Sequence, residues 1–277
     1  MKDPVRFDLN SLWDNNFVLR ARELNEQLDG NYFHENTVPK HFTGNPDART
    51  VLVMLNPGYH NLDFDFFKAS KYRFNTFDQF MLEYIEGNRN YGENDKDRSD
   101  NFDQKQAAFL YDFDDPDLRI PREFWKSTDL KLEAKRNILM NKYQLELIPF
   151  CSRNFKGILD TPAQAKSNFI AFEPFLTAVL NEIFKKERKY IVFCSKQFLN
   201  LFSAAITNDL WKNIFSFSSP KGFKDGKLTL NCSKVRINYQ GIRIDAIIAN
   251  SFPSQALPNA YEKMMRYGTF CYNELYS

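Results

Sequence analysis

The 277-residue chain is predicted to be a single α/β domain, a three-layer α/β/α sandwich around a central, mostly parallel, four-stranded sheet. Two observations predict this class. Short, continuous apolar runs bounded by turn residues recur along the chain, and segments with apolar residues at helical spacing separate them. Such runs are typical of strands buried on both faces, and their alternation with helices is typical of a parallel sheet covered on both faces.

The N-terminal half is expected to contain one helix, one core strand and an irregular insertion. Apolar residues at helical spacing predict a helix at about 11–28, and the apolar run from Val51 to Leu55 predicts the first core strand. The insertion is expected at about 60–130, and within it the stretch from Gly87 to Asp103 is expected to be a long exposed loop, because it has almost no aliphatic residues. The aromatic-rich segment 64–80 favours an amphipathic helix packed on the core, and a stacking platform is the alternative.

The C-terminal half alternates more regularly between helices and strands. Thr161 followed by Pro162 is a strong helix start, and Ser195 is the expected cap of the next helix. Gln240 and Gly241 are expected to form a hairpin turn. The elements expected in chain order are a helix at 131–141, a strand at 143–150, a helix at 162–186, a strand at 189–194, a helix at 196–206, strands at 227–237 and 241–249, and a helix at 259–276.

Charge is spread unevenly along the chain, although the formal net charge is only +2. The segment from Glu83 to Arg119 carries a net −6, and the segment from Lys185 to Arg236 carries a net +8. A basic segment suits a polyanionic partner such as nucleic acid, and a solvated surface is an equally weighted alternative. The residues considered for phosphate contacts are Lys221, Lys224, Lys227, Lys234 and Arg236.

The cysteines and the absence of long apolar segments indicate in which cellular compartment the protein is expected. The four cysteines are too far apart in sequence for a zinc or iron–sulfur knuckle and are expected to be buried thiols in a reducing compartment. The N-terminus lacks the apolar run of a signal peptide, and no stretch approaches the length of a membrane span. We therefore expect a cytoplasmic protein that is not attached to a membrane.

Ligands of parallel α/β sheets bind at the carboxyl ends of the strands, so the segments that follow the core strands are the candidate site. The first is Asn56-Pro57-Gly58-Tyr59-His60. Pro fixes φ, Gly lets the backbone approach a ligand closely, and Asn offers both a donor and an acceptor. An ordinary structural turn is the favoured alternative for this motif taken alone.

Two further segments follow core strands. Glu146, Ser152 and Arg153 are expected near the end of the second core strand. The segment from Asn250 to Gln255 follows the last core strand, and its hydroxyl and amide groups suit contacts with a phosphate backbone.

Four segments in this order resemble the uracil-DNA glycosylase superfamily. GNPDARTVLVMLNPGYH is similar to the first signature in its Asn-Pro-Gly form, found in the mismatch-specific and single-strand-selective branches. IIANSFPSQALP resembles the second signature, usually His-Pro-Ser or Asn-Pro-Ser. YQLELIPFCSR resembles the central strand, and KYIVFCSKQFLNLF resembles the third strand and its helix, with Ser195-Lys196 in place of Gly-Lys. The matches span roughly residues 43–258.

The resemblance implies a base flipped out of the nucleic acid and hydrolysis of its N-glycosidic bond, without a metal or other cofactor. Asn56 would be the catalytic residue, because it corresponds to the residue that positions the attacking water. Pro57, Gly58, Tyr59 and His60 would line the base pocket. One of three aromatic residues would stack on the base: Phe64, Phe66 or Phe67.

The remaining family positions fall on the other strand ends. Glu146 corresponds to the base-reading Asn, and an ionised Glu there would accept from an exocyclic amine and repel a carbonyl oxygen. Phe252 corresponds to the donor that stabilises the departing base, and a Phe side chain cannot donate a hydrogen bond. The residues expected to contact the nucleic acid are Lys196, Ser251, Pro253 and Ser254.

These departures leave alternatives open. The chain lacks paired cysteines near the N-terminus, so we expect none of the iron–sulfur clusters that some branches carry. A non-catalytic module that binds nucleic acid or protein on the same fold is the main alternative, motivated by Phe252 and Glu146. A third hypothesis is a small-molecule hydrolase, which predicts a closed pocket without a basic surface around it.

Overall fold

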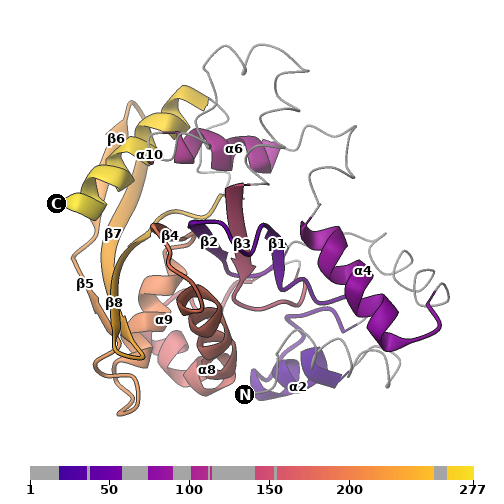
Figure 1. Ribbon diagram of the computed structural model, residues 1–277. Coiled ribbons are helices and arrows are strands. Elements are labelled where there is room, and N and C mark those ends of the chain that lie inside the picture. The colour runs from indigo at the N-terminus through magenta and orange to yellow at the C-terminus, as the bar shows by residue number, and fades with distance from the viewer. Residues whose placement is uncertain are drawn as a thin grey trace.

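Figure 1 shows a computed structural model of the protein, with its helices and strands labelled. The described residues are 19–35, 38–57, 74–89, 101–111, 113, 141–152, 155–252 and 261–277. The helices within them are α2 (Leu19–Gln27), α4 (Phe77–Arg89), α6 (Asn101–Leu110), α8 (Pro162–Phe184), α9 (Gln197–Ala205) and α10 (Tyr261–Tyr276). The strands are β1 (Phe42–Gly44), β2 (Thr50–Met54), β3 (Lys142–Glu146), β4 (Tyr190–Phe193), β5 (Phe215–Phe217), β6 (Lys221–Asp225), β7 (Leu228–Tyr239) and β8 (Ile242–Ile248).

A mixed sheet of eight strands runs through the molecule in the order β1-β3-β2-β4-β8-β7-β5, with β6 paired to β7 (Figure 1). The four strands predicted from apolar runs are confirmed as β2, β3, β4 and β8, and they are parallel neighbours in the order β3-β2-β4-β8. All residues of β2, β3 and β4 are buried. Apolar side chains on both faces of β2 and β4 explain why their sequence runs are continuous, whereas β3 alternates polar and apolar residues although both of its faces are buried.

The prediction of a four-stranded sheet is wrong in extent, because antiparallel strands extend both sides of the parallel core. β1 pairs with β3 at one edge, and β7 pairs with β8 on the other side. Gln240 and Gly241 both have positive φ, at 51° and 78°, which is the geometry of a tight hairpin turn between β7 and β8. β1 and β5 contain three residues each, too few for a recognisable sequence pattern.

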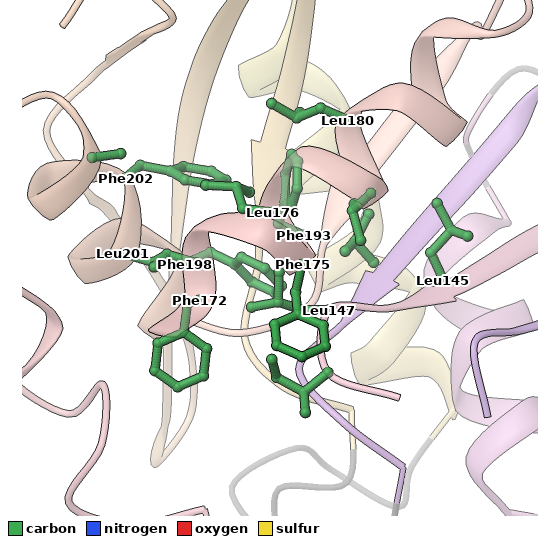
Figure 2. Packing of buried hydrophobic residues seen from close by; sticks show 14 of the residues in the cluster. Leu145, Leu147, Phe172, Phe175, Leu176, Leu180, Phe193, Phe198, Leu201 and Phe202 are labelled. Carbon is green, nitrogen blue, oxygen red and sulfur yellow. The ribbon is translucent and has the colours of Figure 1, made fainter. Parts of the chain in front are cut away.

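Helices cover both faces of the sheet (Figure 1). α8 and α9 pack on the face formed by Val51 and Val53 of β2, whereas α6 and α10 pack on the face formed by Leu52 and Met54. Successive side chains of a strand point to opposite faces, so one strand supplies both cores. Figure 2 shows the first core, where side chains of α8 and α9 lie around Phe193 of β4: Phe172, Phe175, Leu176, Phe198 and Phe202.

Local capping residues define where α8 and α9 begin. The Thr161 side chain accepts from Gln164 N and the Gln164 side chain accepts from Thr161 N, so the capping box and Pro162 start α8 as predicted. Ser195 Oγ accepts from Gln197 N at 3.2 Å, but the N-cap position of α9 is Lys196, one residue later than predicted, and it has no side-chain cap hydrogen bond. Of the helix predicted at 11–28, the described part is α2, and of the helix predicted at 131–141 only its last residue, Asn141, is described, and it is helical.

Two helices lie within residues 60–130, where an irregular insertion was expected. α4 extends through Gly87, and α6 begins at Asn101, so both ends of the stretch predicted as a loop are helical. α6 is tightly packed on α10. A Cβ built on Gly268 would lie 1.9 Å from the backbone oxygen of Phe109. Five consecutive residues of α6, from Gln106 to Leu110, are buried, so its apolar residues form no single stripe, which explains why its sequence pattern is weak.

None of the helices in the described part of the chain is long and apolar enough to cross a bilayer.

Candidate functional site

The carboxyl ends of the four parallel strands meet at one edge of the sheet. Met54 is paired with Glu146, Val53 with Phe193, and Phe193 with Ile248, which places the strand ends level with one another. Pairing continues past β3, because Leu147 N donates to the carbonyl oxygen of Met54 at 2.8 Å. The segments expected to carry the site therefore leave the sheet side by side, as required of a site at this edge.

Asn56 lies just beyond the end of β2, half-buried, and its side chain is held in one orientation. Its Nδ2 donates to the carbonyl oxygen of Pro57 at 3.0 Å and to Ser152 Oγ at 3.1 Å. A carbonyl oxygen can only accept, so the amide nitrogen must face Pro57. No residue in the described ranges donates to Asn56 Oδ1. This oxygen is therefore open to accept a hydrogen bond from water or a ligand.

Ser152 joins the second strand-end segment to the first. Its backbone N donates to the carbonyl oxygen of Pro57 at 3.3 Å, and its hydroxyl accepts from Asn56. The structure thus brings together Asn56, Pro57 and Ser152. Several predicted site residues lie outside the described residues: Gly58, Tyr59, His60, Phe64, Phe66, Phe67, Arg153, Pro253 and Ser254.

Glu146 is the last residue of β3 and is 8% exposed. Gln144 Nε2 donates to its Oε1 at 2.8 Å, and its Oε2 has no hydrogen-bond partner in the described part of the structure. Burial raises the pKa of Glu146 to about 8, against the smaller opposing effects of Gln144, Lys40 and Lys142. The carboxyl group is therefore mostly neutral at pH 7, which replaces the expectation of an ionised acceptor.

A row of buried polar side chains continues from Glu146 along the same face of β3. We call Lys142, Gln144 and Glu146, with Gln106 of α6, the polar row. Lys142 Nζ donates to Gln106 Oε1 and, at 3.2 Å, to Gln144 Oε1. Gln106 Nε2 also donates to Gln144 Oε1, at 3.1 Å. The period-two spacing of these polar residues between buried Tyr143 and Leu145 is the sequence signal that could have revealed the row.

Phe252 lies in the core and not at the surface of the edge. It is 1% exposed, and its ring meets that of Phe109 edge-on at 5.2 Å. A second edge-on contact joins it to Phe102 of α6 at 6.4 Å. Its packing against α6 gives Phe252 a structural role, and its buried ring presents no surface to a ligand.

Asn250 follows β8 and forms hydrogen bonds to β7 and α10. Its Oδ1 accepts from Asn231 N of β7 at 2.8 Å, and its backbone N donates to the hydroxyl of Tyr267 of α10 at 2.8 Å. Ser251 follows it, half-buried. The strand end is held by side-chain hydrogen bonds, which fixes where the final predicted loop begins.

Lys196 lies exposed after β4, immediately before α9, as expected for a residue near the edge. Most of the other basic residues considered for phosphate contacts are already paired. Lys221 pairs with Glu274, and Lys234 and Arg236 both pair with Asp245. Lys224 and Lys227 have no ion-pair partner in the described residues. The acidic partners of Lys221, Lys234 and Arg236 reduce the positive charge that this basic segment presents at the surface.

A cavity of about 300 Å³ lies elsewhere, between α8, β1 and β3. Leu145, Leu147 and Phe175 are among its lining residues, and Asn56 is not. Glu146 borders it, but the bond between Glu146 and Gln144 places the Glu146 side chain on the opposite, α6 face of the sheet. The cavity and the strand-end edge are therefore separate features. Within the described residues, no three or more His, Cys, Asp or Glu side chains are grouped to hold a metal ion.

The site thus consists of a strand-end edge with an oriented amide at Asn56, a hydroxyl at Ser152 and a buried carboxyl group at Glu146. Comparisons of the chain with protein-family models, with curated proteins and with solved structures find no match.

Proposed function

We propose that this protein is a divergent member of the uracil-DNA glycosylase superfamily, which binds nucleic acid and hydrolyses the N-glycosidic bond of a damaged or deaminated base. The observation that supports this proposal is the Asn56 side chain. Its nitrogen is committed to Pro57 and Ser152, and its oxygen is open at the carboxyl edge of the sheet.

The open amide oxygen suits the positioning of water. Asn56 Oδ1 accepts a hydrogen bond from the water, which turns a lone pair of the water toward the sugar carbon. The C–O bond forms as the C–N bond breaks, the bonding electrons leave with the base nitrogen, and the water loses one proton. An amide cannot take up that proton, which passes through solvent to the departing base anion and leaves the neutral base, so Asn56 acts by orientation.

An excision assay tests the proposal with uracil, hypoxanthine and xanthine in single- and double-stranded DNA. Asn56→Ala is expected to lower the excision rate by about 10²-fold, because the water is no longer oriented. Asn45→Ala is a matched control, since Asn45 also precedes a proline but lies at the opposite end of β2, and its side chain accepts only from Asp47 N within the described residues. Failure to release any of the three bases, combined with no DNA binding at low salt, contradicts the proposal.

The buried Phe252 supports a second candidate, a non-catalytic module that binds nucleic acid. Its position corresponds to the donor for the departing base, and its ring packs on Phe109 instead. Loss of one such donor is worth about 3 kcal/mol of transition-state stabilisation. DNA binding by the wild type without turnover, unchanged in Asn56→Ala, favours this module over the enzyme.

A further inference from the structure

The cavity of about 300 Å³ between α8, β1 and β3 has largely apolar walls. Leu145 of β3 and Leu147, which follows β3, line it together with Phe175 and Val179 of α8. All four side chains are buried. The volume lies at the lower end of the range for small-molecule pockets, and such walls suit the apolar body of a small ligand.

A buried cation, Arg188, lines the same cavity and is 6% exposed. Its guanidinium donates only to backbone carbonyl oxygens, those of Pro46, Ala48, Glu182 and Ile183. These contacts use four of the five N–H donors and leave one N–H on Nη2 for a ligand. Carbonyl oxygens satisfy donors but have no net charge, so the positive charge of Arg188 is not compensated by them.

The acidic groups around Arg188 supply no anion for it either. The carboxylates nearby belong to ion pairs of their own, Lys185 with Glu182 and Lys186 with Asp47. Tyr143 lies beneath the guanidinium, whose Cζ is 5.4 Å from the ring centroid, and burial raises the pKa of this phenol, which keeps it neutral. The two ion pairs cancel, so the positive charge of Arg188 remains at the cavity wall.

We propose that this cavity binds a small amphipathic carboxylate, with its apolar body against Phe175 and Val179 and its carboxylate accepting from Arg188. A buried charge is costly unless an opposite charge compensates it. A carboxylate supplies both the missing negative charge and an acceptor for the remaining N–H, while the apolar walls hold the rest of the molecule. The site is separate from the Asn56 edge, and the inference does not depend on the proposed function.

Isothermal titration calorimetry of the wild type with octanoate, octanol and octylammonium tests the ligand class. The three probes share one apolar chain and differ in charge. Octanoate is expected to bind at a single site and at least about tenfold more tightly than octanol, because a hydrogen bond to a charged group contributes more than a neutral one. Octylammonium is expected to bind more weakly than octanol, since its charge repels Arg188.

Two variants of α8 locate the site. Ala178 lines the cavity, and Ala178→Trp is expected to lower octanoate affinity at least about tenfold, because the indole occupies the space that the ligand needs. Ala163→Trp is the matched control, since Ala163 belongs to the same helix but is exposed and does not line the cavity. Its octanoate affinity should equal that of the wild type.

Arg188→Gln tests the charge directly. It is expected to lower octanoate affinity to the level of octanol and to leave octanol affinity unchanged. Arg188 also bonds to four backbone carbonyls, so circular dichroism first establishes that this variant folds. If it does not fold, the probe series and the two tryptophan variants decide the question by themselves.

Three results overturn the inference: no binding of octanoate, equal affinity for octanoate and octanol, or equal effects of Ala178→Trp and Ala163→Trp. Each of them leaves the proposed function standing, because base excision at the Asn56 edge is measured with a different ligand at a different site.

Discussion

At the scale of single residues, this edge of the sheet contains amide side chains in which the nitrogen and the oxygen have different hydrogen-bonding roles. The Asn56 side chain donates from its nitrogen to the Pro57 carbonyl oxygen and to Ser152 Oγ, and its oxygen is available to accept a hydrogen bond. Asn250 does the reverse, since its oxygen accepts from Asn231 N. Orientation of this kind makes a polar group specific for a donor or for an acceptor, which residue identity alone does not determine.

Asn250 offers a stability test of this orientation. Asn250→Ala removes the acceptor of the Asn231 N–H of β7, which water can then reach, and is expected to lower the free energy of unfolding by about 0.5–1.5 kcal/mol. Asn250→Asp retains an acceptor oxygen for Asn231 N and is expected to cost less. Denaturant unfolding of the three proteins checks the order, and an Asp variant less stable than the Ala variant contradicts the assigned orientation.

Glu146 makes stability depend on pH. Its pKa is raised from 4.5 to about 8, so between these values the folded state holds a proton that the unfolded state has lost. The free energy of unfolding of the wild type should therefore fall, relative to Glu146→Gln, as pH rises from 4.5 to about 8, by on the order of 5 kcal/mol. Urea unfolding across this range measures the difference. A difference independent of pH would show that burial does not protonate this carboxyl group.

At the scale of elements, the packing of α6 on α10 supports the face of the sheet on which the polar row lies. Gln106 of α6 takes part in the polar row, and Phe109 of the same helix packs against Phe252. Gly268 of α10 permits this approach because it has no Cβ. The position of α6 therefore connects the helix layer to both Glu146 and the last strand-end segment.

Gly268→Ala is expected to destabilise the protein by about 3 kcal/mol. Its new Cβ would meet the Phe109 backbone oxygen at 1.9 Å, and backbone cannot rotate away as a side chain can. Gly87→Ala is the matched control, because nothing lies within 4 Å of a Cβ at this exposed position of α4, and alanine there should stabilise by about 0.5–1 kcal/mol. Thermal unfolding compares the two variants, and equal effects would argue against the close helix contact.

At the scale of the whole molecule, chain segments far apart in sequence meet at one edge of the sheet. Asn56 and Ser152 are 96 residues apart and share a hydrogen bond. The order β3-β2-β4-β8 places the ends of β3 and β4 on either side of β2, which leaves the Asn56 turn between them. A ligand at this turn would therefore contact side chains from several strand ends, as in other parallel α/β sheets.

The sequence by itself determined the parallel core and its strand ends, because apolar runs such as Val51 to Met54 report burial on both faces directly. It also determined the start of α8 and the β7–β8 hairpin, where Thr161, Pro162 and Gly241 act through local geometry. These features depend on contacts within a few residues of each other, and a local pattern can carry that information.

Only the tertiary structure decided what each polar or aromatic residue at the edge does. Phe252 is core because α6 packs over it, and Glu146 is neutral because other elements bury it. The short β1 and the weakly patterned α6 form through partners more than thirty residues away in the sequence. Burial and pKa arise from the sum of such distant contacts, so a strand end can be located from sequence while its chemistry depends on the assembled fold.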